Sequence, residues 1–92
     1  MEINSVVRAL GALAQQSRLR IFRQLVQTGP SGMAAGEIAA DLDIAPATLS
    51  FHLKEMNHAG LIVARQDGRF IYYSADFSRM SALVDYLTEN CC

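Results

Sequence analysis

The only two cysteines of this 92-residue chain are adjacent, Cys91 and Cys92. Neighbours in sequence cannot link distant parts of a fold, so a structural disulfide framework is excluded. A disulfide between the two is also disfavoured, because successive Cα atoms stand about 3.8 Å apart, below the usual range for disulfides. We therefore expect thiols that stay reduced or are held by a ligand.

The segment Ala35–Gly60 carries residue types suited to reading DNA. Its apolar spacing predicts two short helices joined by a tight turn, a helix-turn-helix, with Pro46 in the first turn of the second helix. Leu49, Leu53 and Met56 form the apolar stripe of that helix. At about 100° per residue, the opposite face is small, hydroxylated and basic, as a major-groove reader requires. We predict that Ala47, Thr48, Ser50 and Phe51 approach bases and that His52 and Lys54 meet phosphates.

A β-hairpin is predicted directly after the helix-turn-helix. Leu61–Arg65 and Phe70–Ser74 are rich in β-branched and aromatic residues, and Asp67-Gly68 between them predicts a type I′ turn. Arg65 and Arg69 bracket the tip of this wing, where we expect them to meet phosphates or the minor groove. The alternatives are a hairpin that only covers the core and a helix pair in which a neighbour covers Phe51.

Further helices are predicted at both ends of the chain, at Ile3–Ala14 with Asn4 or Ser5 as cap, at about Arg18–Thr28 with Ser17 as cap, and at about Asp76–Asn90 with Asp76 as N-cap. The first and last of these are more apolar than a small monomer needs. Packing them against a second copy would give the two-fold symmetry that DNA half-sites require, although the apolar stripes also suit an intramolecular core.

These elements predict a mainly α fold with a small β-hairpin wing. We expect one winged helix-turn-helix domain over residues 1–92, with the helix-turn-helix at 35–60, the wing at 61–75 and a C-terminal dimerisation helix at 76–90. The first and last helices would form a homodimer, and its partner would be double-stranded DNA.

Composition limits the class of function. The chain is 51% hydrophobic with a formal net charge of −1, which indicates one compact domain. Nucleic-acid binding usually brings excess positive charge, but the distribution matters more than the total, and Arg18, Arg20 and Arg23 cluster on one segment. No membrane-length apolar run or signal peptide is visible, so we expect a cytoplasmic protein without a membrane partner. No catalytic constellation is visible either, so we expect no enzyme activity.

The order of elements resembles the winged-helix repressors of the ArsR/SmtB type, the bacterial arsenic- and metal-responsive regulators. The resemblance covers nearly the whole chain. It is most specific at Ser17-Arg18-Leu19-Arg20-Ile21, at Ala45–Leu53, at Ala59-Gly60-Leu61-Ile62 and at Gly68-Arg69 with Tyr72-Tyr73. It implies a homodimer that represses a resistance operon by binding operator DNA and leaves the DNA when a toxic ion binds.

The sequence departs from the family pattern in ways that narrow the inducer site. Gln15-Gln16 replaces the Asp-Pro that many members carry before the second helix. Some arsenic sensors carry a Cys-x-Cys pair at the start of the helix before the recognition helix. The matching positions here are Ala34 and Gly36, so that site is absent. The cadmium site with N-terminal cysteines is absent as well, and Asp85 alone does not supply the zinc site of the last helix.

Cys91 and Cys92 remain as the inducer site that the resemblance implies, with arsenite or antimonite as the inducer and no catalytic cofactor. Trivalent arsenic takes three sulfur ligands in this family, so the third would come from residues beyond Cys92 or be replaced by solvent. Adjacent side chains diverge on a helix, so chelation by both thiols requires the backbone to unwind. Two rival interpretations stay open: a thiol redox-sensing repressor, and a winged-helix protein-interaction module anchored by Phe51.

Overall fold

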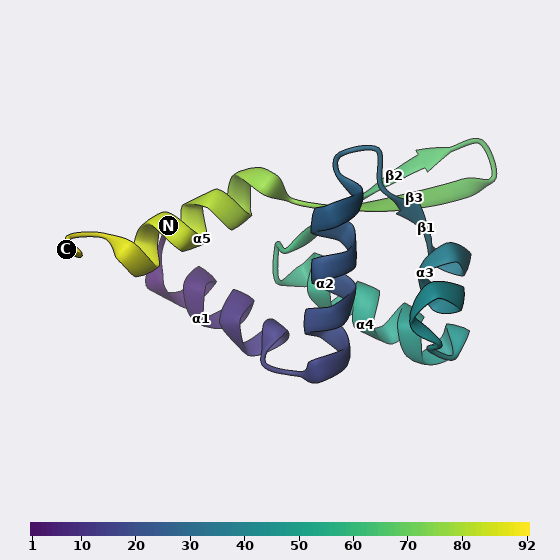
Figure 1. Ribbon diagram of the computed structural model, residues 1–92, viewed down its shortest axis with the longest axis horizontal. Coiled ribbons are helices and arrows are strands. Elements are labelled where there is room, and N and C mark those ends of the chain that lie inside the picture. Colours follow the sequence, from purple (N-terminus) through teal and green to yellow (C-terminus); the bar gives the residue numbers. More distant parts are fainter.

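The computed structural model describes residues 1–92 and places the helix-turn-helix and the wing at the end of the molecule opposite the two chain termini (Figure 1). Along the chain the elements are α1 (Ile3–Leu13), α2 (Gln16–Thr28), β1 (Met33–Ala34), α3 (Ala35–Leu42), α4 (Pro46–His58), β2 (Ile62–Asp67), β3 (Phe70–Ala75) and α5 (Phe77–Thr88). The predicted fold class, mainly α with a hairpin wing, is confirmed. No helix is long and apolar enough to cross a membrane.

The helix caps differ in part from the predictions. The side chain of Glu2 accepts hydrogen bonds from the backbone N–H groups of Asn4 and Ser5, so neither Asn4 nor Ser5 caps α1. Gln15, and not Ser17, caps α2 by accepting from the N–H of Arg18. Both caps are long side chains that reach the free N–H groups of the first helical turn from an extended backbone. N-cap preferences favour the shorter Ser, Thr, Asp and Asn, so they do not predict Glu or Gln at these positions. The predicted cap Asp76 is confirmed, since it accepts from the N–H of Arg79.

The sheet has the strand order β1-β3-β2, with both pairings antiparallel. Met33 pairs with Tyr73, so the short strand β1 ties the hairpin to the helical part. The hairpin turn is shifted by one residue from the predicted one. Asp67 still pairs with Phe70, and the two-residue loop is Gly68-Arg69. Only Gly68 has a positive φ, which fits a type II′ turn with glycine first.

The core is built from one face of each helix and the inner ends of the strands. In α4 the predicted stripe of Leu49, Leu53 and Met56 is almost fully buried. These side chains pack in one cluster with residues of α1, α2, α3, α5 and the wing, among them Val6, Ile21, Leu25, Ile38, Ile62 and Leu83. The buried stripe therefore fixes the rotation of α4 and turns its opposite face outward.

The end of α4 is joined tightly to the start of the wing. Gly60 has a φ of 78°, and the N–H of Leu61 donates to the carbonyl of Met56, which closes the helix. The N–H of Asp76 donates to the carbonyl of Leu61, so the start of α5 is held at the same point. The guanidinium of Arg79 packs over Gly60 and occupies the space that a Cβ would need.

We expect Gly60→Ala to lower the free energy of unfolding by roughly 1–2 kcal/mol, because alanine resists the positive φ and its Cβ would meet Arg79. Gly36→Ala is a matched control, since a Cβ at that helical glycine meets nothing within 4 Å. Urea denaturation of both variants measures the difference. Equal stability of the two variants would show that the junction tolerates a side chain.

Candidate DNA interface and cysteine pair

The outward face of α4 presents the small and hydroxylated side chains that were predicted to approach bases. Ala47, Thr48 and Ser50 are exposed, and Phe51 is 57% exposed although it is a large apolar residue. Lys54 is exposed on the same side. Because Phe51 is more than half exposed, the alternative in which a neighbour covers it does not describe this face. This face of α4 is therefore open to solvent.

His52 is placed differently from the prediction. Its side chain is only 6% exposed, and its Nδ1 accepts a hydrogen bond of 3.0 Å from Nε of Arg18. The pKa of His52 is lowered by burial and, secondly, by the positive charge of Arg18. In this structure His52 therefore has its partner within the chain, and its contact with a phosphate stays a prediction. It lies at the border of the core stripe, where a neighbouring helix covers it.

The stability of the fold should depend on pH through His52. Its pKa is lowered in the folded state, so near and below its ordinary value of 6.5 the unfolded chain binds a proton that the folded chain does not. We expect the free energy of unfolding to fall as the pH drops from about 7 toward the lowered pKa, and to level off below it. Urea midpoints of wild type and His52→Gln across this range test the prediction. Parallel profiles for the two proteins would contradict it.

Arg18 is a residue of the interface that sequence reasoning did not assign to the site. Besides its bond to His52, its guanidinium carbon lies 5.8 Å from the centre of the Phe51 ring. One cation on α2 thus holds both a buried and an exposed aromatic side chain of α4. The family-like motif at Ser17–Ile21 contains this arginine, but only the fold shows that it reaches α4.

The two arginines predicted to contact DNA from the wing differ in how many contacts they make within the chain. Nη2 of Arg65 donates to the carbonyl of Ser31, Nη1 lies 3.6 Å from the Asp67 carboxylate, and the guanidinium lies 5.0 Å from the Tyr72 ring centre. Arg69 is exposed in the loop at the tip and forms no ion pair. The exposed Arg65–Asp67 pair is weak, so Arg65 keeps part of its charge available. Arg69 is the less constrained cation.

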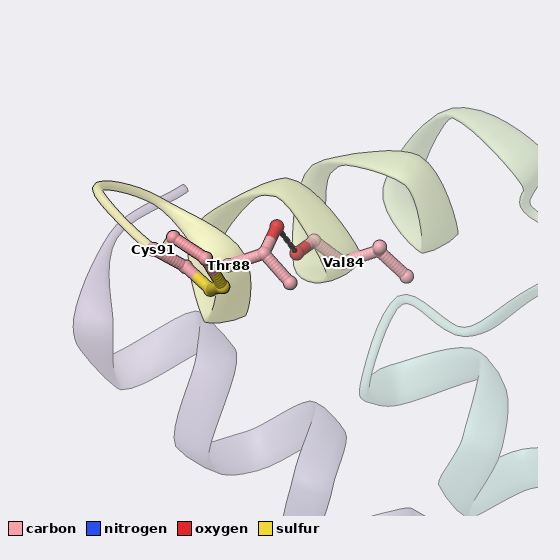
Figure 2. Close-up of a disulfide and its surroundings, with 4 residues drawn as sticks. Val84, Thr88 and Cys91 are labelled. Atoms are coloured by element: carbon pink, nitrogen blue, oxygen red, sulfur yellow. Dashed lines mark hydrogen bonds between the residues drawn. A yellow bond between two sulfur atoms is a disulfide. The ribbon is translucent and has the colours of Figure 1, made fainter.

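The cysteines lie beyond the end of α5 and form a disulfide (Figure 2). The expectation of two reduced or ligand-bound thiols is therefore not what the structure shows. The helix ends at Thr88, and Asn90 has a positive φ, so helical geometry no longer separates the two side chains. For the same reason, no further unwinding is needed for both sulfurs to meet one partner. No group of three or more His, Cys, Asp or Glu side chains is placed to hold a metal ion.

Exposed apolar side chains lie on α1 and α5, at the end of the molecule where both termini lie (Figure 1). On α1, Ile3 and Val7 are 60% and 61% exposed and Leu10 is 40% exposed. On α5, Val84 and Leu87 are each more than half exposed. These are the outer sides of the stripes predicted to pack against a second copy. An intramolecular core does not account for them.

A helix-turn-helix with an uncovered second helix, followed at once by a basic hairpin, defines a winged helix-turn-helix DNA-binding domain. Residues 13–65 match the model of a family described as a helix-turn-helix domain. The chain is 31% identical over 81 residues to the arsenical resistance operon repressor of Bacillus subtilis, covering 88% of this chain and 73% of that protein. The chain belongs to the ArsR/SmtB family of winged-helix transcriptional regulators.

Other similar proteins agree on this class. The transcriptional activator HlyU of Vibrio cholerae is 28% identical over 94 residues, which cover 100% of this chain and 84% of that protein. An uncharacterized HTH-type regulator of Bacillus subtilis, YceK, is 38% identical over 63 residues, but the chain spans only 62% of its length. A solution structure of a homodimeric winged helix-turn-helix domain from Mycobacterium bovis is 32% identical, with a TM-score of 0.76, over 95% of this chain and 81% of that one.

Proposed function

We propose that this chain is a homodimeric repressor of a metalloid-resistance operon that leaves its operator when trivalent arsenic or antimony binds Cys91 and Cys92. The observation that carries the DNA-binding part is the outward face of α4. It is uncovered from Ala47 to Lys54, whereas the opposite face of the same helix is almost fully buried. Family membership supplies the class of function, and this face supplies the place where bases would be read.

Within this interface the residues divide by the chemistry of their side chains. Ala47, Thr48, Ser50 and Phe51 would meet base edges and thymine methyl groups in the major groove. Lys54, Arg65 and Arg69 would meet phosphates or, from the wing, the minor groove. His52 would act by holding α4 in place through Arg18.

The exposed apolar stripes of α1 and α5 support the dimer. A second copy would bury Ile3, Val7, Val84 and Leu87 and would place two α4 helices on successive turns of the DNA major groove. The homodimeric state of the Mycobacterium bovis domain supports the same assembly. The proposal implies a cytoplasmic location, because the operator DNA of a bacterial cell lies in the cytoplasm.

The cysteine pair supports a switch based on sulfur chemistry. Both residues are exposed and lie shortly beyond the end of α5, one of the two helices assigned to the dimer. In the reduced form two thiolates can bind a soft trivalent ion, with a solvent oxygen as the remaining ligand. Binding there would move the end of α5 and change the spacing of the two α4 helices.

The disulfide favours a second candidate, a redox-sensing regulator of the same DNA. In that case the two thiols would lose two electrons and two protons to an oxidant such as a peroxide, and the disulfide would be the released state. Both candidates use the cysteine pair, but the signal is an oxidant in this case and a trivalent ion in the other.

Fluorescence anisotropy of the reduced protein on labelled DNA from its own promoter tests the proposal. Arsenite is titrated into one sample, and a peroxide is titrated into another. Release by arsenite under reducing conditions is expected. Release by peroxide alone would favour the redox candidate, and no release by either would remove the switch from the cysteine pair.

A further inference from the structure

A hollow of about 220 Å³ lies between α1, the start of α2 and the end of α4. Arg8 of α1, Arg18 of α2 and His58 of α4 bring basic side chains to its lining, and Glu55 of α4 brings one acid. Gly11 opens its α1 side, because no Cβ stands there. None of these residues except Arg18 has been given a role above.

The positive charge of this hollow is not neutralised within the chain. The only ion pair in the structure joins Arg65 and Asp67 on the wing, so neither Arg8 nor Arg18 is paired with Glu55. Nε of Arg18 donates to His52, which leaves the terminal nitrogens of the guanidinium without a hydrogen-bond partner in the chain. An anion in the hollow would relieve this excess.

The hollow continues the predicted DNA-reading face. At about 100° per residue, His58 lies on the same side of α4 as Phe51 and Lys54, two turns or less further along the helix. By the same rotation, Arg8 lies away from the exposed stripe of Ile3, Val7 and Leu10 on α1. It would therefore stay accessible when that stripe is covered by a second copy.

We propose that this hollow binds a backbone phosphate of the operator DNA, with Arg8 and Arg18 as its charged donors and His58 as a further hydrogen-bonding group. Guanidinium groups present planar, paired N–H donors that match phosphate oxygens. The proposal rests on the proposed DNA-binding function and extends its contact surface from α4 and the wing to α1 and α2. Glu55 would weaken the contact by like-charge repulsion.

The test compares three charge variants on the same operator duplex as a function of salt concentration. Arg8→Gln should weaken binding several-fold and reduce the slope of log K against log salt by about 0.9 per protomer. Arg23→Gln removes the same charge from an exposed site of α2 outside the hollow, and it should leave the slope unchanged. Glu55→Gln should tighten binding, because it removes the only negative charge of the hollow.

The outcomes separate this inference from the proposed function. If the wild-type protein binds no promoter duplex, the DNA-binding proposal itself fails. If the wild type binds and Arg8→Gln keeps both its affinity and its salt slope, only the phosphate site is overturned. The remaining possibility is that the hollow binds a small free anion, and a titration with inorganic phosphate followed by NMR detects it. Saturable chemical-shift changes at Arg8, together with an unchanged salt slope for DNA binding by Arg8→Gln, would assign the hollow to such an anion and overturn the DNA contact.

Discussion

Serine at both Cys91 and Cys92 is expected to abolish release from DNA by arsenite while operator affinity stays that of the wild type. The two residues lie beyond α5, at the opposite end of the molecule from α3 and the tip of the wing (Figure 1), so the DNA interface keeps its structure. Serine hydroxyls are hard ligands and do not replace thiolates toward a soft ion. Anisotropy of the reduced proteins on promoter DNA, with and without arsenite, measures both quantities.

The single serine variants divide the roles of the two thiols. Each keeps one possible thiolate ligand, so each should respond to arsenite more weakly than the wild type and more strongly than the double variant. Retained full response in the double variant would remove the cysteine pair from the mechanism. Because neither single variant can form the Cys91–Cys92 disulfide, both should also lose any response to peroxide.

Replacing Arg69 by alanine is expected to weaken binding to all DNA sequences by up to about tenfold at physiological salt. It should also reduce the salt slope by about 0.9 per protomer. Arg69 is the exposed cation of the wing loop and forms no ion pair that would offset the loss. A phosphate contact carries no sequence information, so the preference for the operator over other duplexes should change little.

Arg65→Ala provides the matched comparison on the same hairpin. Arg65 already contacts the Ser31 carbonyl, the Asp67 carboxylate and the Tyr72 ring, so its loss should disturb the hairpin more and the salt slope less. Anisotropy at four salt concentrations separates the two effects. An Arg69→Ala protein with unchanged affinity and slope would show that the wing does not meet the DNA backbone.

Local chemistry was sufficient to predict much of this fold. Pro46 begins α4, Asp76 caps α5, and the stripe of Leu49, Leu53 and Met56 is buried as its spacing predicts. Each of these features depends on residues within about two helical turns of one another. The exposed face of α4 follows from the buried stripe, so its rotation was also predictable.

Features that depend on long-range contacts or on chain ends were not predictable in the same way. His52 lies at the edge of the stripe, and only the arrival of Arg18 from α2 decides that it is a buried hydrogen-bond acceptor. The hairpin turn lies one residue later than predicted, because Asp67 pairs with Phe70 and leaves Gly68 and Arg69 as the loop. The cysteines were expected directly after a longer helix, whereas α5 ends at Thr88 and the cysteines lie in the non-helical segment beyond it.

The most direct test of the account is the specificity of DNA binding by the reduced protein. Anisotropy is measured on a duplex from its own promoter and on a scrambled duplex of equal length and base composition, at one physiological salt concentration. Promoter binding at least about 10³-fold tighter than binding to the scrambled duplex is expected, as the proposed reading of base edges by the α4 face requires. Equal affinity for the two duplexes would contradict it and would favour a protein partner anchored by Phe51.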